Sequence, residues 1–139
     1  MIATMAGLLL ILTSSSLAQN KAVAPASVDL SRKVGLKRGL CLVLGLPDRR
    51  GVDDVIDLVR NTDLLVYFQS PSERDLLAIR RAAEVENQLG KTLFSGNGEY
   101  NRICLADNLA GVILVSSEAA KVVSEQELLR ALHPGGKAC

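Results

Sequence analysis

The sequence predicts an α/β fold, a three-layer sandwich in which helices cover both faces of a mostly parallel sheet. Short, continuous apolar runs alternate along the chain with longer segments whose apolar residues recur at helical spacing. The runs contain few polar residues, which is typical of strands buried on both faces. Strands that are joined through helices pair in parallel with right-handed crossovers.

The first strand and helix are predicted in the stretch GLCLVLGLPDRRG, residues 39–51, and just after it. Residues 40–44 form the apolar run, which ends at Gly45. Apolar residues at helical spacing then predict a helix over residues 51–60. Asp53 and Asp54 fall in its first turn, where acidic side chains favour the helix dipole.

A second strand is predicted over residues 64–68 and ends at the polar pair Gln69-Ser70. A long helix over residues 72–89 follows, because a serine precedes it as a cap and Gly90 can end it.

The third and fourth strands are predicted over residues 91–94 and 111–115, with a glycine- and asparagine-rich loop, residues 95–108, between them. One helix over residues 118–132 should follow. The stretch HPGG at 133–136 should end it, with His133 favoured at the helix C-terminus by the dipole.

Composition narrows the function classes. The chain has 139 residues, enough for one domain with a core, and a net charge of +1. This charge balance gives no electrostatic basis for binding nucleic acid or an anionic membrane. Aromatic residues make up only 3%, so a base-stacking platform is not expected.

The first residues have a different composition. An apolar segment, residues 6–13, is too short to span a bilayer, and Ser16-Leu17-Ala18 offers small residues for cleavage before Gln19. We therefore expect a signal peptide over residues 1–18, a linker over 19–33 and a domain over 34–139. This predicts an exported protein, periplasmic or extracellular. The alternatives are a buried N-terminal helix or a misassigned start codon, which would leave the protein cytoplasmic.

Several short motifs carry no chemistry. Cys41, Cys104 and Cys139 include no C-x-x-C pair, so a metal site is not predicted. Cys41 lies within the first apolar run, where a thiol packs as a small hydrophobe. Residues 90–92 read GKT, but the earlier glycine that a phosphate-binding loop needs is absent.

Taken together, the strand ending at Gly45, the stretch LADNLAGVILVSS and the stretch LHPGG resemble the class I S-adenosylmethionine-dependent methyltransferases over residues 34–138. The resemblance implies a Rossmann-like fold with S-adenosylmethionine as cofactor. In that family the P-G-G turn leads into strand five of seven, so the chain would hold the N-terminal part of the domain, incomplete at the C-terminus and continued by a missing segment. The alternative is that the short chain folds as a minimal domain or a dimer. The layout is also similar to exported bacterial proteins in which such a domain precedes a quinoprotein-type β-propeller.

The resemblance also implies a set of cofactor-binding positions. Gly45 and Asp48 would belong to the loop that contacts the methionine part. In this loop Leu46, Pro47 and Asp48 replace the flexible middle, and Arg49 stands where a later glycine is usual. The ribose would lie at Gln69 or Ser70, where the family has an acid. The acid that faces the adenine would be replaced by Asn97 or displaced to Glu99, and Asp107 would be the acid before strand four. No catalytic base is indicated.

Three functions remain open from the sequence. The first is an S-adenosylmethionine-dependent methyltransferase whose methyl acceptor is unspecified. The second is a non-catalytic binding or scaffold module with the same fold in an exported protein. The third, a dinucleotide-binding domain, expects G-x-G-x-x-G and an acid about 20 residues later, and the chain has neither.

Overall fold

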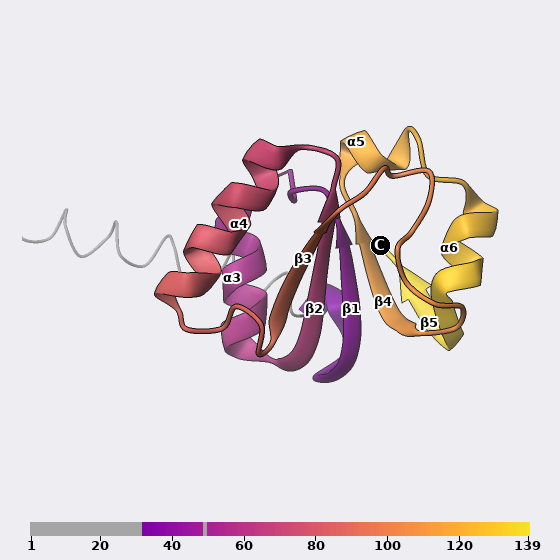
Figure 1. The fold of residues 1–139 in the computed structure, drawn as a ribbon. Coiled ribbons are helices and arrows are strands. Elements are labelled where there is room, and N and C mark those ends of the chain that lie inside the picture. Colours follow the sequence, from indigo (N-terminus) through magenta and orange to yellow (C-terminus); the bar gives the residue numbers. More distant parts are fainter. Residues whose placement is uncertain (1–31, 49) are drawn as a thin grey trace, which may run out of the picture.

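The computed structural model describes residues 32–48 and 50–139. It shows a five-stranded sheet in the order β3-β2-β1-β4-β5, in which every neighbouring pair is parallel (Figure 1). The predicted signal peptide, most of the predicted linker and Arg49 lie outside the described residues. The predicted α/β, Rossmann-like class is confirmed.

Strands and helices alternate along the chain, except that no helix lies between β3 and β4 and two helices lie between β4 and β5. In chain order they are β1 (Arg38–Leu44), α3 (Val52–Asn61), β2 (Asp63–Ser70), α4 (Glu73–Val85), β3 (Leu93–Asn97), β4 (Ala110–Val115), α5 (Ser117–Ala120), α6 (Glu125–Ala131) and β5 (Leu132–Ala138). Residues 98–109, which join β3 to β4, are called the crossover loop below.

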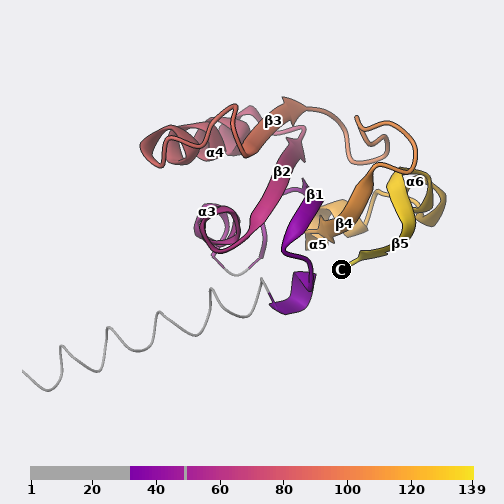
Figure 2. The same cartoon turned by 90° about the horizontal axis from the view of Figure 1, so that it is seen from below.

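The two faces of the sheet are covered differently. Helices α3 and α4 pack against one face and bury Val43, Val66 and Phe68 from the central strands. On the other face, Leu42 and Ile113 pack against the crossover loop and against residues of α5, α6 and the start of β5. Figures 1 and 2 show α3 and α4 grouped beside β1 to β3, and α6 beside β5.

The single helix predicted over residues 118–132 is wrong, because two serines each begin a separate helix. The Ser116 side chain accepts a hydrogen bond from the Ala119 amide and caps α5. The Ser124 side chain accepts one from the Glu127 amide and caps α6. Serine caps of this kind satisfy amides that the first helical turn leaves free.

The interpretation of LHPGG as a turn before strand five is also wrong, since these residues lie in β5. Pro134 is tolerated because β5 is an edge strand, where a missing amide need not break a ladder. Gly135, at φ +86, accompanies the register shift opposite Ala110 and Val112. His133 is an exposed β5 residue, not a residue in the last turn of a helix.

The observed ends of β3 and α4 also differ from the predicted ones. The third strand begins at Leu93 and continues to Asn97, because its last three residues pair with the end of β2. Helix α4 ends at Val85, four residues before the predicted end, and Asn87 takes a positive φ of 56° just after it.

Candidate functional site

The strand order creates a switch point beside β1. The crossover through α3 leads from β1 to β2 on one side, whereas β3 connects back to β4 on the other side of β1. In open parallel sheets ligands bind beyond the carboxyl ends of the strands at such a point. The candidate site is therefore the region above Leu44 at the end of β1 and Val115 at the end of β4.

Gly45, the first residue after β1, lies at this point with φ +76°. Its amide donates a hydrogen bond of 3.0 Å to the Gln69 carbonyl, which holds the ends of β1 and β2 together. A Cβ on Gly45 would lie 2.7 Å from the Tyr100 hydroxyl oxygen and would collide with the Ser116 hydroxyl. Glycine is therefore required here, and the space beside it is filled by the chain's own side chains.

The Tyr100 hydroxyl lies where the ends of three strands meet. It contacts the Ser70 hydroxyl at 3.3 Å, while Gly45 and Ser116 follow β1 and β4 directly. Burial raises the pKa of Tyr100 above its ordinary value, and the Ser70 hydrogen bond partly opposes this.

Gln69, expected at the ribose, is fully buried and already bonded. Its Nε2 donates to the Glu99 and Arg102 carbonyls, at 2.8 Å each, and its Oε1 accepts from the Cys104 amide at 2.9 Å. Both donors of the side-chain amide are used. Gln69 therefore holds the crossover loop against the sheet and offers no donor to a sugar.

Ser70, the alternative at the ribose, is also fully buried. Besides its contact with Tyr100, its hydroxyl accepts a hydrogen bond of 3.1 Å from the Ser72 amide, at the start of α4.

Asp48 and Asn97 lie at the same edge of the sheet. Asp48 accepts hydrogen bonds from the Ser117 hydroxyl, at 2.7 Å, and from the Ser117 amide, at 3.3 Å. It thus joins the loop after β1 to the beginning of α5. Asn97 is exposed at the end of β3, where its side chain is open to solvent.

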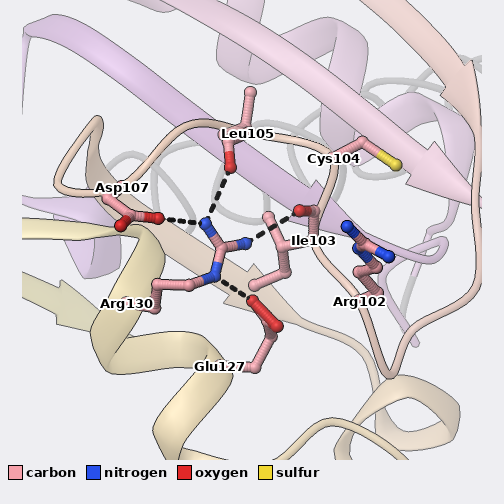
Figure 3. Close-up of a pocket in the computed structure, with 7 residues that line it drawn as sticks. All are labelled: Arg102, Ile103, Cys104, Leu105, Asp107, Glu127 and Arg130. Atoms are coloured by element: carbon pink, nitrogen blue, oxygen red, sulfur yellow. Dashed lines mark hydrogen bonds and ion pairs between the residues drawn. The ribbon is translucent and has the colours of Figure 1, made fainter.

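Asp107 is not part of this group, because it precedes β4 and lies near the opposite, amino end of that strand. It pairs with Arg130 at 2.6 Å. Arg130 also donates to the carbonyls of Leu105, at 3.0 Å, and Ile103, at 2.9 Å, and bonds Glu127 (Figure 3). Arg130 therefore holds the far part of the crossover loop to α6, in a surface pocket of about 580 Å³.

Sequence reasoning missed Tyr100 and Ser116 at the candidate site. A signal was available for the tyrosine, because it is the only aromatic residue in a polar, glycine-containing loop and so has reason to be buried. Ser116 gave only the ordinary signal of a helix cap.

The residues as they lie do not fit S-adenosylmethionine. The positive φ of Gly45 would suit close approach of a ligand to the backbone. However, the space beside it holds two hydroxyl groups, and the residues expected at the ribose are committed to other contacts. A ligand would therefore need the crossover loop to move.

Neither a metal-binding cluster nor a membrane-spanning helix occurs among the described residues. No group of three His, Cys, Asp or Glu residues among them could hold a metal ion. No helix in residues 32–48 or 50–139 is long and apolar enough to cross a membrane.

Comparison with known proteins gives matches only at the level of structure. No protein-family model matches the chain, and no curated protein does either. A Methanococcus maripaludis protein, provisionally assigned as an S-adenosyl-L-methionine-dependent methyltransferase, superposes with a TM-score of 0.66 at 18% identity, over 81% of this chain and 52% of that one. An S-adenosylmethionine-dependent methyltransferase from Aquifex aeolicus gives 0.62 at 19% identity, over 78% and 58%.

A third structure, the 4+2 cyclase SpnF, has a TM-score of 0.64 at 18% identity, over 81% of this chain and 42% of the cyclase. The chain thus spans between two fifths and three fifths of the length of these proteins. Identities this low establish the methyltransferase-like fold alone, and the cyclase shows that one fold carries more than one reaction.

Proposed function

We propose that the chain is an S-adenosylmethionine-dependent methyltransferase-like domain, and that the cofactor binds at the switch point between β1 and β4. The methyl acceptor is unspecified. The observation that carries the proposal is Gly45, held at a positive φ at the end of β1 in the strand order β3-β2-β1-β4-β5. Fold similarity to methyltransferases supports the choice of ligand.

A second candidate is a non-catalytic binding or scaffold module with the same fold. It is favoured by one specific observation, the commitment of Gln69 and Ser70 to the chain's own loop and helix. A charge-assisted acceptor for ribose hydroxyls would normally be a carboxylate, and neither residue supplies one.

Calorimetric titration with S-adenosylmethionine separates the two candidates. We expect saturable binding with a dissociation constant below about 1 mM, a level that corresponds to roughly −4 kcal/mol. If neither the wild type nor the loop-released variants described in the next subsection bind S-adenosylmethionine at millimolar concentration, the function is the non-catalytic module.

A matched pair of glycine variants tests the place of binding. Gly45 and Gly90 share φ +76°, but a Cβ at Gly90 has nothing within 4 Å. Gly45→Ala should therefore abolish binding, whereas Gly90→Ala should leave the affinity unchanged at a comparable backbone strain. Circular dichroism would confirm that both variants fold. Equal affinities in the two variants would contradict binding beside Gly45.

The cellular context is a separate proposal. We propose that residues 1–18 are a signal peptide and that the protein is exported. N-terminal sequencing of protein expressed with an export pathway should give Gln19 as the first residue. A mature protein that begins at Met1 would contradict export.

A further inference from the structure

We propose that the crossover loop closes the ligand position of this fold, that Gln69 and Tyr100 hold it closed, and that an adenosine-containing ligand binds only when the loop is released. The identity of the ligand as S-adenosylmethionine rests on the proposed function. The closure itself rests on contacts within the chain.

The first contact is made by Gln69, which comes from β2 and reaches three backbone groups of one short segment. It bonds the carbonyls of Glu99 and Arg102 and the amide of Cys104. One buried side chain therefore fixes the backbone of residues 99–104. Because an unbonded buried polar group is unfavourable, the loop and Gln69 each satisfy the other.

The second contact places the loop in the ligand position. The ring of Tyr100 packs with Leu42, Leu44 and Ile113, and its hydroxyl lies beside Gly45 and Ser70. Gly45 directly follows β1, and Ser70 is the last residue of β2. Both therefore lie at the carboxyl ends of the strands, where open parallel sheets bind ligands. Tyr100 thus occupies the space that a ligand touching Gly45 would need.

The start of the loop fits tightly against the same anchor. The Gly98 amide donates a hydrogen bond of 3.2 Å to the Ser70 carbonyl. A Cβ on Gly98 would lie 2.9 Å from the Gln69 Nε2 atom. The loop therefore leaves β3 in direct contact with Gln69, with no room for a side chain or a ligand between them.

Release of the loop from the sheet should cost little free energy, because few of its side chains are buried. Between Gly98 and Cys104 only the side chains of Tyr100 and Ile103 are buried, and the segment contains no helix or strand. Segments with few buried apolar groups open more readily than packed elements. Closure of this kind lowers the apparent affinity of a ligand by the fraction of molecules in the open form.

Three variants test the closure. Gln69→Ala removes all the Gln69 contacts with the loop. Gln69→Glu replaces the amide donors with oxygens, which repel the Glu99 and Arg102 carbonyls, and also adds an acid at the end of β2. Tyr100→Phe removes only the hydroxyl and keeps the packed ring, so it guards against loss of folding. Gln88→Glu is the control, because it makes the same charge change at a side chain whose oxygen accepts from Thr92.

Amide hydrogen exchange of residues 98–104 and calorimetric titration with S-adenosylmethionine are measured for each protein. We expect exchange in this segment to be about tenfold faster or more in both Gln69 variants, with a smaller increase in Tyr100→Phe and none in Gln88→Glu. Affinity should rise by about tenfold or more in Gln69→Ala, and further in Gln69→Glu.

The outcomes distinguish the two proposals. Unchanged exchange in all three loop variants would overturn the closure, as would faster exchange with unchanged affinity in a chain that binds the ligand. Faster exchange with no binding by any protein would uphold the closure and overturn S-adenosylmethionine as the ligand.

Discussion

The two halves of the sheet are held together by different kinds of interaction. Strands β1 to β3 have one face covered by α3 and α4, two amphipathic helices of 10 and 13 residues, over a core of apolar side chains that Val112 and Leu114 of β4 extend. Strands β4 and β5, with Leu42 and Leu44 of β1, have the other face covered by the crossover loop, by two short helices of 4 and 7 residues and by fewer apolar side chains. Single polar side chains, Gln69 from β2 and Arg130 from α6, fix the position of this loop.

The difference explains why no single contact controls the helix-covered half, whereas single contacts control the position of the crossover loop. A helix buried along its whole apolar face is held by many small contributions that no single contact controls. The crossover loop depends on Gln69 at one end and Arg130 at the other. Losing either should free part of the loop while the first half stays folded.

The largest expected effect is in the helix-covered half. Phe68 is fully buried between β2 and the helices, so Phe68→Ala should lower the free energy of unfolding by about 3–5 kcal/mol. Leu65→Ala, on the same strand but 46% exposed, should change it by less than about 1 kcal/mol. Urea denaturation measures both. Similar losses in the two variants would show that this half has no dominant apolar core.

A smaller effect is expected from the Arg130 anchor. Arg130→Met removes the donors to the Ile103 and Leu105 carbonyls and should cost about 1–3 kcal/mol of stability. Arg80→Met, which loses one exposed bond to the Ser95 hydroxyl, is the control. If urea denaturation gives equal midpoints for the two variants, the far part of the crossover loop does not depend on Arg130.

The smallest effect compares one thiol from each half. Burial, followed by the nearby Cys139, raises the pKa of Cys41 from its ordinary 9.0 to about 12, whereas Cys104 lies exposed in the crossover loop. A thiol reagent at pH 8 should label Cys104 in the folded chain, and Cys41 only after denaturation.

The same pKa predicts how stability depends on pH. Between about pH 9 and about pH 12 the Cys41 thiol ionises in the unfolded chain but not in the folded one, so its contribution should lower stability as pH rises through this range. A Cys41→Ala variant should lose part of that decrease. Labelling of Cys41 at the rate of Cys104 in the folded chain would contradict its burial.

The helix-covered half could be predicted well from the sequence, as could β4, but α5, α6 and β5 could not. Apolar periodicity located β1, α3, β2 and α4 because each buries a regular pattern of side chains. The same rule joined α5 and α6 into one helix, because the serine caps at Ser116 and Ser124 look like ordinary polar positions. It also missed β5, since Pro134 and Gly135 are normally signs of a turn.

The candidate site could be predicted only in part from the sequence, for a similar reason. The position of Gly45 follows from the end of an apolar run. The roles of Gln69 and Tyr100 depend on contacts between residues 30 or more positions apart, which no local pattern contains. Asp107 was grouped with the site through the resemblance, yet the direction of β4 places it at the other end of that strand.

Hydrogen exchange of the Cys104 amide, with and without saturating S-adenosylmethionine, tests the central claim most directly. This amide donates to Gln69 only while the crossover loop is closed. Slow exchange in the free protein and faster exchange in the presence of the ligand are the predicted results, because the ligand displaces the loop. Fast exchange in the free protein, or stronger protection when the ligand is bound, would contradict a loop that occupies the ligand's place.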